Sequence, residues 1–458
     1  MGTTIDVARW IDQRKVSRFQ IQVLILCVIV MIVDGYDALS IGYVVPLLAT
    51  KWGVAKPAFG PVFSAGLVAM ALGALLFGAL ADRFGRRNVI LFCLGFVGIF
   101  NLLKVVATSV ESLLILQFVA GLGVGGVMPN AYALMTEYAP KARRALMVTI
   151  VGLGYAIGSS GAGLIAAKFI TSHGWQFMFY VGGIAPLVTL PFVIAGLPES
   201  IRFLALRQGQ SGRLERILKK IDSALPAASE IRLVSSEEKG QGVPVVQLFR
   251  HRRAPTTVLL WIAAFMDLCI IYFMTPWLPV MLHDAGFTLA QASLGTAVFS
   301  ASGIVGGPTI GRMMDRFGGI VVLALTYGVA AVFIVLIGSI GGGSFAALCL
   351  IIFGAGFCAV GGHLGIGALA SNLYPTFMRS TGVGWALGIG RFCSGISPMI
   401  GAWLIARHWS HSSIFSAVAV PACFAALAII PIQAVHRPES APQEPAAQEV
   451  ETEPSQAG

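Results

Sequence analysis

Charged residues are scarce in this chain. Only 11% of its 458 residues are Asp, Glu, Lys or Arg, whereas soluble proteins carry about 25%. The mean hydropathy is +0.82, and together these values exclude an ordinary soluble domain. Seven cysteines are present, and all of them lie inside long apolar stretches. This placement favours small buried side chains over a set of disulfides or a metal cluster.

The sequence also lacks the motifs of common enzymes. It contains no nucleophile–base pair, no His-Glu-x-x-His zinc motif and no phosphate-binding loop. Residues 5–20 are polar and basic, so the apolar core of a cleavable signal peptide is missing there. The sequence therefore predicts a protein that is not an enzyme and that needs neither a metal nor a cofactor.

Long apolar runs dominate the rest of the chain. Each is close to the roughly 20 residues that a helix needs to cross a bilayer. We expect an all-α polytopic membrane protein with twelve transmembrane helices. The expected helices lie near residues 21–48, 58–81, 88–107, 111–137, 144–168, 175–197, 255–282, 290–314, 319–340, 344–371, 379–406 and 412–435.

These runs fall into two groups of six, over residues 21–197 and 255–435. The long polar segment 198–254 separates them and contains a basic amphipathic pattern that suits a membrane surface. Residues 1–20 precede the first group. Residues 436–458 are rich in Pro, Glu and Ala, and we expect this tail to be disordered.

The basic residues predict the orientation. With the N-terminus in the cytoplasm, most of the 31 Lys and Arg residues fall on the cytoplasmic side, as the positive-inside rule requires. The asymmetry accounts for the net charge of +10 without a nucleic acid partner. We expect a multi-pass protein of the inner membrane with both termini in the cytoplasm. The basic residues expected in external loops are Lys51, Lys56, Lys104, Lys168 and Arg407.

The two groups of helices repeat each other in sequence. When the two groups are aligned at a constant offset, identical Asp, Pro and Gly residues occupy matching positions. The matches are Asp34 with Asp267, Pro46 with Pro279, Gly73 with Gly306, and Asp82-Arg83-Phe84-Gly85 with Asp315-Arg316-Phe317-Gly318. Two parallel six-helix repeats imply a pseudo-two-fold axis along the membrane normal. They also imply a substrate site between the halves, near the middle of the membrane.

The loop from Gly78 to Arg87 resembles the signature loop of the major facilitator superfamily, and the copy at Asp315 agrees. The resemblance implies two pseudo-symmetric six-helix bundles. It also implies charged residues that lock the cytoplasmic ends of helices and release them during a conformational change; the alternative is ordinary helix-end charge. The candidate gating residues are Asp82, Arg83, Arg86, Arg87, Asp315, Arg316 and Arg379.

A narrower resemblance starts from Asp34-Gly35-Tyr36-Asp37 in the first helix. This motif is similar to that of aromatic acid:proton symporters, the carriers of 4-hydroxybenzoate, protocatechuate, benzoate and vanillate type. The runs Gly121–Ala131 and Arg379–Arg391 are similar to theirs as well. The resemblance implies a monomer that imports an aromatic carboxylic acid with protons by alternating access. It implies that Asp34, Asp37, Asp82, Arg379 and Arg391 are required.

Three charged residues inside apolar runs form the candidate site. A charge at the bilayer centre costs at least ~2.5 kcal/mol, so such residues face a wet or protein-lined interior. Asp34 and Asp37 share one helical face, and Arg391 is expected at the same depth. A guanidinium binds a carboxylate through two parallel hydrogen bonds. We expect Arg391 to hold the substrate and the two acids to carry the proton. The alternative is a permanent structural ion pair.

The remaining candidates are less specific. His363 is not a general feature of the resembled group, and its alternatives are helix packing, contact with a substrate hydroxyl, or a proton relay. Asp267 is a possible second counter-ion or a capped residue. The aromatic candidates for contact with a substrate ring, each with plain packing as its alternative, are Tyr36, Tyr272, Phe273, Trp277, Trp385 and Phe392.

Other functions compete with aromatic acid import. An importer of a non-aromatic acid such as muconate would use the same arginine. A proton-coupled efflux antiporter is a second alternative, although the fifth helix, around Gly154 to Gly161, lacks the Gly-Pro pair of such exporters. A membrane receptor for aromatic acids is the alternative from another class.

Overall fold

The structure is a computed structural model of the chain. It describes residues 7–206, 211–222, 248–249, 253–339, 344–374 and 379–435. Within these residues twelve helices are long and apolar enough to cross a membrane, which confirms the expected number. The tail 436–458 that we expected to be disordered lies outside the described residues, as does most of the segment 198–254.

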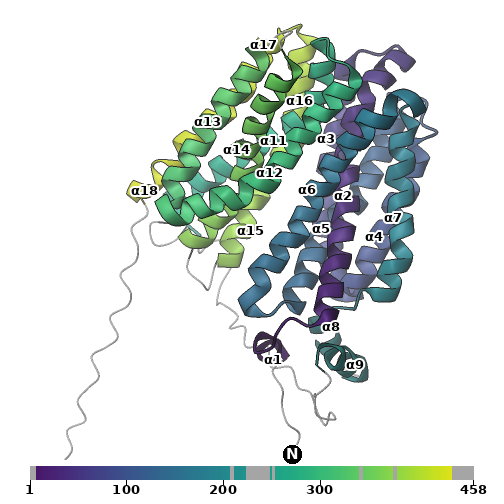
Figure 1. The fold of residues 1–458 in the computed structure, drawn as a ribbon, viewed down its shortest axis with the longest axis vertical. Helices are drawn as coiled ribbons and strands as arrows, with labels where there is room; N and C mark the ends of the chain where they lie inside the picture. Colours follow the sequence, from purple (N-terminus) through teal and green to yellow (C-terminus); the bar gives the residue numbers. More distant parts are fainter. Residues whose placement is uncertain are drawn as a thin grey trace, which may run out of the picture.

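The first six spans form one bundle, drawn in purple to teal in Figure 1. Local chemistry sets their ends. Ser17 and Gln20 form a capping box at the start of α2, and Gly53 ends this helix in the left-handed conformation with a φ of 63°. The elements are α2 (Arg18–Trp52), η1 (Lys56–Phe59), α3 (Gly60–Phe84), α4 (Arg86–Lys104), α5 (Val110–Tyr138), α6 (Lys141–His173) and α7 (Gln176–Gly196).

The second six spans form a matching bundle beside the first (Figure 1). Its elements are α11 (Ala254–Asp284), α12 (Leu289–Phe317), α13 (Gly319–Ser339), α14 (Phe345–Leu373), α15 (Arg379–Gly390), α16 (Cys393–Ala406) and α17 (His411–Ile429). The short helix α18 (Ile432–Val435) follows α17.

One expected helix is broken. We predicted a continuous helix over residues 379–406, but α15 ends at Gly390 and α16 begins at Cys393. In the joint, the Arg391 N–H donates to the Gly388 carbonyl at 3.1 Å, as in a tight turn. Gly390 packs so closely on α11 that an added Cβ would lie 2.7 Å from Leu268 Cδ1. The glycines around the joint weaken the helix, and the break follows directly after Gly390.

Short helices cover one end of the first bundle. They are α1 (Val7–Asp12), α8 (Ile201–Leu206) and α9 (Ser211–Ile221), and Figure 1 shows them near the start of α2. The predicted amphipathic segment is α9, but its apolar face packs on the protein and not on a membrane surface. Its Leu214, Ile217, Leu218 and Ile221 are buried in a cluster with residues of the first bundle. Asp12 at the end of α1 accepts hydrogen bonds from the Lys141 N–H at 2.7 Å and from Arg144 at 3.0 Å.

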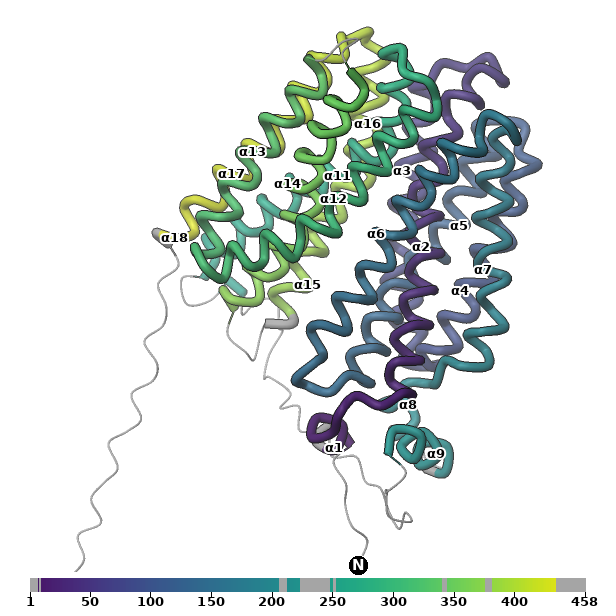
Figure 2. Tube along the Cα trace, in the orientation of Figure 1, coloured from purple at the N-terminus to yellow at the C-terminus, as the bar shows by residue number. Residues whose placement is uncertain are grey.

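The two bundles meet at the opposite end, where α6 packs on α12 and α3 packs on α16. Lys56 and Asp284 form a salt bridge between the bundles. Phe63 and Trp277 pack edge to face, with ring centroids 5.1 Å apart. The helices of the two bundles diverge toward the end that carries α1 and α9 (Figure 2). The structure is thus held together across the bundles mainly at one end.

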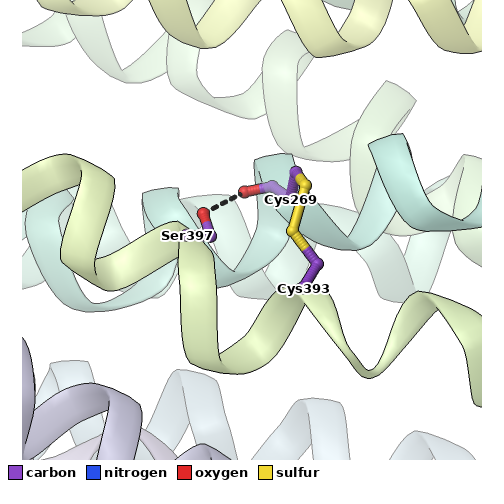
Figure 3. Close-up of a disulfide and its surroundings, with 3 residues drawn as sticks. All are labelled: Cys269, Cys393 and Ser397. Carbon is purple, nitrogen blue, oxygen red and sulfur yellow. Dashed lines mark hydrogen bonds between the residues drawn. A yellow bond between two sulfur atoms is a disulfide. The ribbon is translucent and has the colours of Figure 1, made fainter.

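A disulfide corrects one expectation. We expected all cysteines to be unpaired, but Cys269 of α11 and Cys393 of α16 are bonded, with Cα atoms 5.5 Å apart (Figure 3). The Ser397 hydroxyl also donates to the Cys269 carbonyl at 2.7 Å. The register between two helices far apart in the sequence brings these cysteines together, and spacing along the chain carries no signal of it. The other five cysteines are free.

Candidate functional site

A cavity of about 110 Å³ lies between the two bundles, where the repeat predicted a site. Its walls come from α2, α3, α5 and α6 on one side and from α11, α12 and α14 on the other. Most of the lining is apolar. The polar side chains in it are Asp37, Gln117, Tyr155, Ser159, Tyr272, Thr275 and Ser300.

The two acids of α2 are buried beside this cavity. Asp37 lines it, and both Asp34 and Asp37 are almost inaccessible to solvent. Both carboxylate oxygens of Asp34 and one of Asp37 have no hydrogen-bond partner among the described residues. A buried carboxylate without partners is costly. These acids therefore need a proton or a cation.

Gly35 explains how the acids reach this position. Its Cα faces the backbone of Tyr155 on α6 so closely that a Cβ would overlap the Tyr155 carbonyl oxygen. Only glycine allows this approach of α2 to α6. The acids on either side of Gly35 are thereby held next to the Tyr155 ring, which lines the cavity and interacts electrostatically with Asp34.

Arg391 reaches the same region from the other bundle. It lies in the joint between α15 and α16, and its Nη2 is 4.0 Å from the Met128 sulfur of α5. The guanidinium interacts electrostatically with Asp34, Tyr155 and Tyr272. No salt bridge joins it to a carboxylate of the described residues. The arrangement therefore resembles an open anion site more than a permanent ion pair.

His363 and Asp267 form a pair of their own. The His363 Nδ1 of α14 lies 2.7 Å from Asp267 Oδ2 of α11. Asp267 is completely buried, and Tyr327 of α13 interacts with its carboxylate. We named Asp267 as a possible counter-ion or capped residue and His363 as a substrate contact. The structure brings the two together, and neither lines the cavity.

Of the aromatic candidates, Tyr272 lines the cavity and the others do not. The Tyr36 hydroxyl donates to the Met178 carbonyl at 3.0 Å, and the Trp277 indole donates to the Pro398 carbonyl at 3.1 Å. Trp385 stacks on Trp261, and Phe392 is 70% exposed. None of these four candidates lines the cavity. The aromatic side chains that line it are Phe63, Tyr155, Tyr272 and Phe299.

Two polar residues of the first bundle were missed. Gln117 of α5 lines the cavity, and its Oε1 has no hydrogen-bond partner in the described residues. Lys104 was assigned to an external loop, but it is completely buried in α4. Its ammonium donates to Asn101 at 2.8 Å and interacts electrostatically with Asp37. Both residues interrupt apolar runs, and that interruption is a signal that sequence reasoning could have used.

The arginines of the predicted gate contact their own bundle. Arg86 forms a salt bridge with Glu137 of α5 at 2.6 Å. The Arg87 N–H donates to Glu199 at 3.0 Å, and its side chain donates to the Ile194 carbonyl at 2.6 Å. These contacts join the end of α4 to the ends of α5 and α7.

The other predicted gating residues lie in the last turns of α3 and α12 and at the start of α15. Arg83 lies over the Phe84 ring and Arg316 over the Phe317 ring. Asp82 and Asp315 are exposed. Arg379 begins α15, and its side chain lies outside the described residues. Arg86 and Arg87 thus link different helices at this end of the first bundle.

Known proteins resemble this chain over most of its length. The family model of the Major Facilitator Superfamily matches residues 26–293 and 260–456. The 4-hydroxybenzoate transporter PcaK of Pseudomonas putida is 36% identical, over 94% of this chain and 96% of its own length. The gallate transporter of Pseudomonas putida is 37% identical, over 93% and 94%. The benzoate transport protein of Acinetobacter baylyi is 31% identical, over 92% and 91%.

A solved structure has the same fold. It is the crystal structure of a bacterial homolog to the human lysosomal transporter Spinster, in an inward-facing and occupied conformation. The TM-score is 0.65 with 15% sequence identity, and the match covers 92% of this chain and 95% of that one.

Proposed function

The chain belongs to the major facilitator superfamily, and from that premise we propose that it imports an aromatic carboxylic acid together with protons. Relatives that match it over nearly their whole length carry 4-hydroxybenzoate, gallate and benzoate in their names. These three compounds share one carboxylate on one aromatic ring. The proposal is therefore that this chain carries a compound of that class across the inner membrane, as a monomer with both termini in the cytoplasm.

The position of Arg391 is the observation that supports the proposal most directly. Its guanidinium extends from the second bundle to Met128 of the first, without a salt bridge to a described carboxylate. A planar guanidinium in a dry site binds a carboxylate through two hydrogen bonds. A substrate carboxylate at Arg391 would then extend its ring toward the cavity between Tyr155 and Tyr272. Rings of this kind stack offset or edge to face.

Asp34 and Asp37 are the proposed proton carriers. Both are buried, and three of their four oxygens lack a hydrogen-bond partner among the described residues. Asp34 interacts electrostatically with Arg391 and is its counter-ion before substrate arrives. When Asp34 takes up a proton, the arginine is left with an uncompensated charge that the substrate carboxylate neutralises. Release of the substrate inside then favours release of the proton.

Alternating access follows from where the bundles touch. Residues 21–197 and 255–435 are the proposed rigid units, connected by the cytoplasmic segment 198–254. In the conformation described, the Lys56–Asp284 salt bridge and the Phe63–Trp277 contact hold the external ends together. These contacts must part when the site opens outward. The loop residues Asp82, Arg83, Asp315, Arg316 and Arg379 are proposed to close the cytoplasmic end in that state.

Uptake into proteoliposomes tests the proposal. The purified protein is reconstituted, an inward proton gradient is imposed, and radiolabelled benzoate, 4-hydroxybenzoate, gallate and muconate are offered. We expect accumulation of at least one aromatic acid. Arg391→Ala should abolish it. Arg391→Lys keeps the positive charge but cannot form the two parallel hydrogen bonds of a guanidinium, so it should raise KM by about tenfold.

Arg407→Ala is the matched control, because Arg407 follows α16 and lies over the Trp403 ring, away from the cavity. It should transport like the unmodified protein. Normal uptake by Arg391→Ala would remove the arginine from the mechanism. Accumulation of muconate alone would favour a carrier of non-aromatic acids. If no acid accumulates in vesicles that contain folded protein, efflux and receptor functions become the better explanations.

A further inference from the structure

We infer that Asp267 and His363 form a second proton-binding site, in the second bundle, and that it takes up one proton in each transport cycle. The inference rests on the proposed function, because it assigns part of the proton coupling of that transporter to this pair. The hydrogen bond between them is 2.7 Å long and lies inside the membrane-spanning part of α11 and α14.

The position of the pair relates it to the cavity. Ile271 of α11 and Val360 of α14 both line the cavity. Asp267 precedes Ile271 by one helical turn, and His363 follows Val360 by one turn on the same helical face. The pair therefore lies directly next to the cavity, on its cytoplasmic side in the proposed orientation. Asp267 is also the repeat partner of Asp34 in the sequence.

The two residues differ in exposure. The Asp267 side chain is 0% exposed and the His363 side chain is 30% exposed. Since His363 shares a face with Val360, its exposed part is directed toward the space between the bundles. A carboxylate accepts hydrogen bonds only, so the His363 nitrogen that faces it carries the hydrogen. The second ring nitrogen, Nε2, is then the atom that can take a proton from water.

The proton on His363 determines the net charge of this buried pair. The second oxygen of Asp267 is buried, and the Tyr327 hydroxyl that interacts with the carboxylate carries no positive charge to balance it. With His363 protonated, the pair has no net charge. With His363 neutral, it carries one buried negative charge, which is costly in a dry interior. Closing the bundles over the pair therefore costs less free energy when the pair is protonated. Because the two side chains interact strongly, they gain and lose this proton as a unit.

Other ionisable groups near the pair do not replace this role. Tyr327 of α13 and Tyr272 of α11 interact with Asp267, and Cys358 of α14 interacts with Tyr327. Arg391, in the joint after α15, interacts with Tyr272. On α12 and α17, the other ionisable side chains among the described residues are Arg312, Asp315 and Arg316 in the last two turns of α12, and His411 and Cys423 of α17. Asp34 and Asp37 lie on α2, which also packs on α11.

The inference predicts the charge that moves in each cycle. One proton on Asp34 or Asp37 neutralises a substrate monoanion, so a second proton on the pair makes the cycle carry one net positive charge. The measurement is the ratio of internal to external 4-hydroxybenzoate at which protein-dependent flux reverses. It is made in proteoliposomes with the membrane potential clamped at zero and a pH gradient of one unit. Two protons require a ratio of about 100, and one proton requires about 10.

The variants separate coupling from folding. We expect His363→Gln and the double variant Asp267→Asn/His363→Gln to reverse near a ratio of about 10 while still exchanging substrate at equal pH. The double variant contains no uncompensated buried charge. Imposing a negative potential inside should accelerate uptake by the unmodified protein and not by these variants. His411→Gln, at the start of α17, is the matched control and should reverse at about 100.

Three outcomes would overturn the inference. They are a ratio near 10 for the unmodified protein, an unchanged ratio in the double variant, and loss of exchange in both variants, which would make the pair part of folding or substrate binding. The absence of any protein-dependent flux of an aromatic acid in the unmodified protein would instead contradict the proposed function. The two failures are therefore distinguishable.

Discussion

Gly35 of α2 and Tyr155 of α6 are in direct backbone contact, and a Cβ on Gly35 would overlap the Tyr155 carbonyl oxygen. The contact fixes the distance between the buried acids and a ring that lines the cavity. We expect Gly35→Ala to destabilise the protein by roughly 1–3 kcal/mol through overpacking and to reduce transport. Thermal unfolding in detergent measures the first effect. Gly161→Ala on α6, which has no atom within 4 Å of the added Cβ, should leave both properties intact.

Glu137 and Asp82 should behave differently when neutralised. Glu137 pairs with Arg86 at 2.6 Å and accepts the Ser200 hydroxyl at 2.6 Å, so Glu137→Gln removes a bridge between helix ends. We expect it to lower the thermal midpoint. Asp82 is exposed, and Asp82→Asn should slow transport while leaving the midpoint unchanged. Equal midpoints for both variants would mean that the Glu137 pair adds no stability.

The cysteines can be counted directly. Five cysteines are free and two are bonded. Maleimide labelling of the denatured protein should therefore modify five thiols before reduction and two more afterwards. Peptide mass spectrometry should assign the additional two to Cys269 and Cys393. Labelling of all seven thiols without reduction would show that the bond is absent in the isolated protein.

The salt bridge between Lys56 and Asp284 crosses the bundles at the end opposite α1 and α9, which is the external end in the proposed orientation. Lys56→Ala should favour the outward-open state, but only by up to ~1 kcal/mol because partly exposed ion pairs are weak. The rate at which a cysteine introduced at Gly42, on the cavity wall, reacts with an external thiol reagent reports this shift. Lys51→Ala, which removes a charge over the Trp175 ring within one bundle, should not change that rate.

The sequence predicted the parts of the molecule that depend on composition and repetition. Apolar runs of bilayer length predicted twelve spans, and the aligned residues of the two halves predicted where the cavity lies. Asp37 was named because a charge in an apolar run is expensive enough to stand out. The placing of Asp37 on the cavity wall agrees with that reasoning.

What the sequence did not predict depends on the register between distant helices. The Cys269–Cys393 bond and the Asp267–His363 pair each need two helices to meet at a particular rotation. Periodicity within one helix carries no information on that rotation. The aromatic residues were chosen by chemistry alone, and the chain uses Tyr36 and Trp277 to hydrogen-bond neighbouring helices.

The break in the eleventh span gives Arg391 a second consequence. Because the residue lies between α15 and α16, a carboxylate bound there, as we propose, would act on the joint between two helices and not on the side of one continuous helix. Binding at this joint would then change the angle between α15 and α16. Leverage of this kind would let a short displacement at the joint become a longer one at the far end of α15.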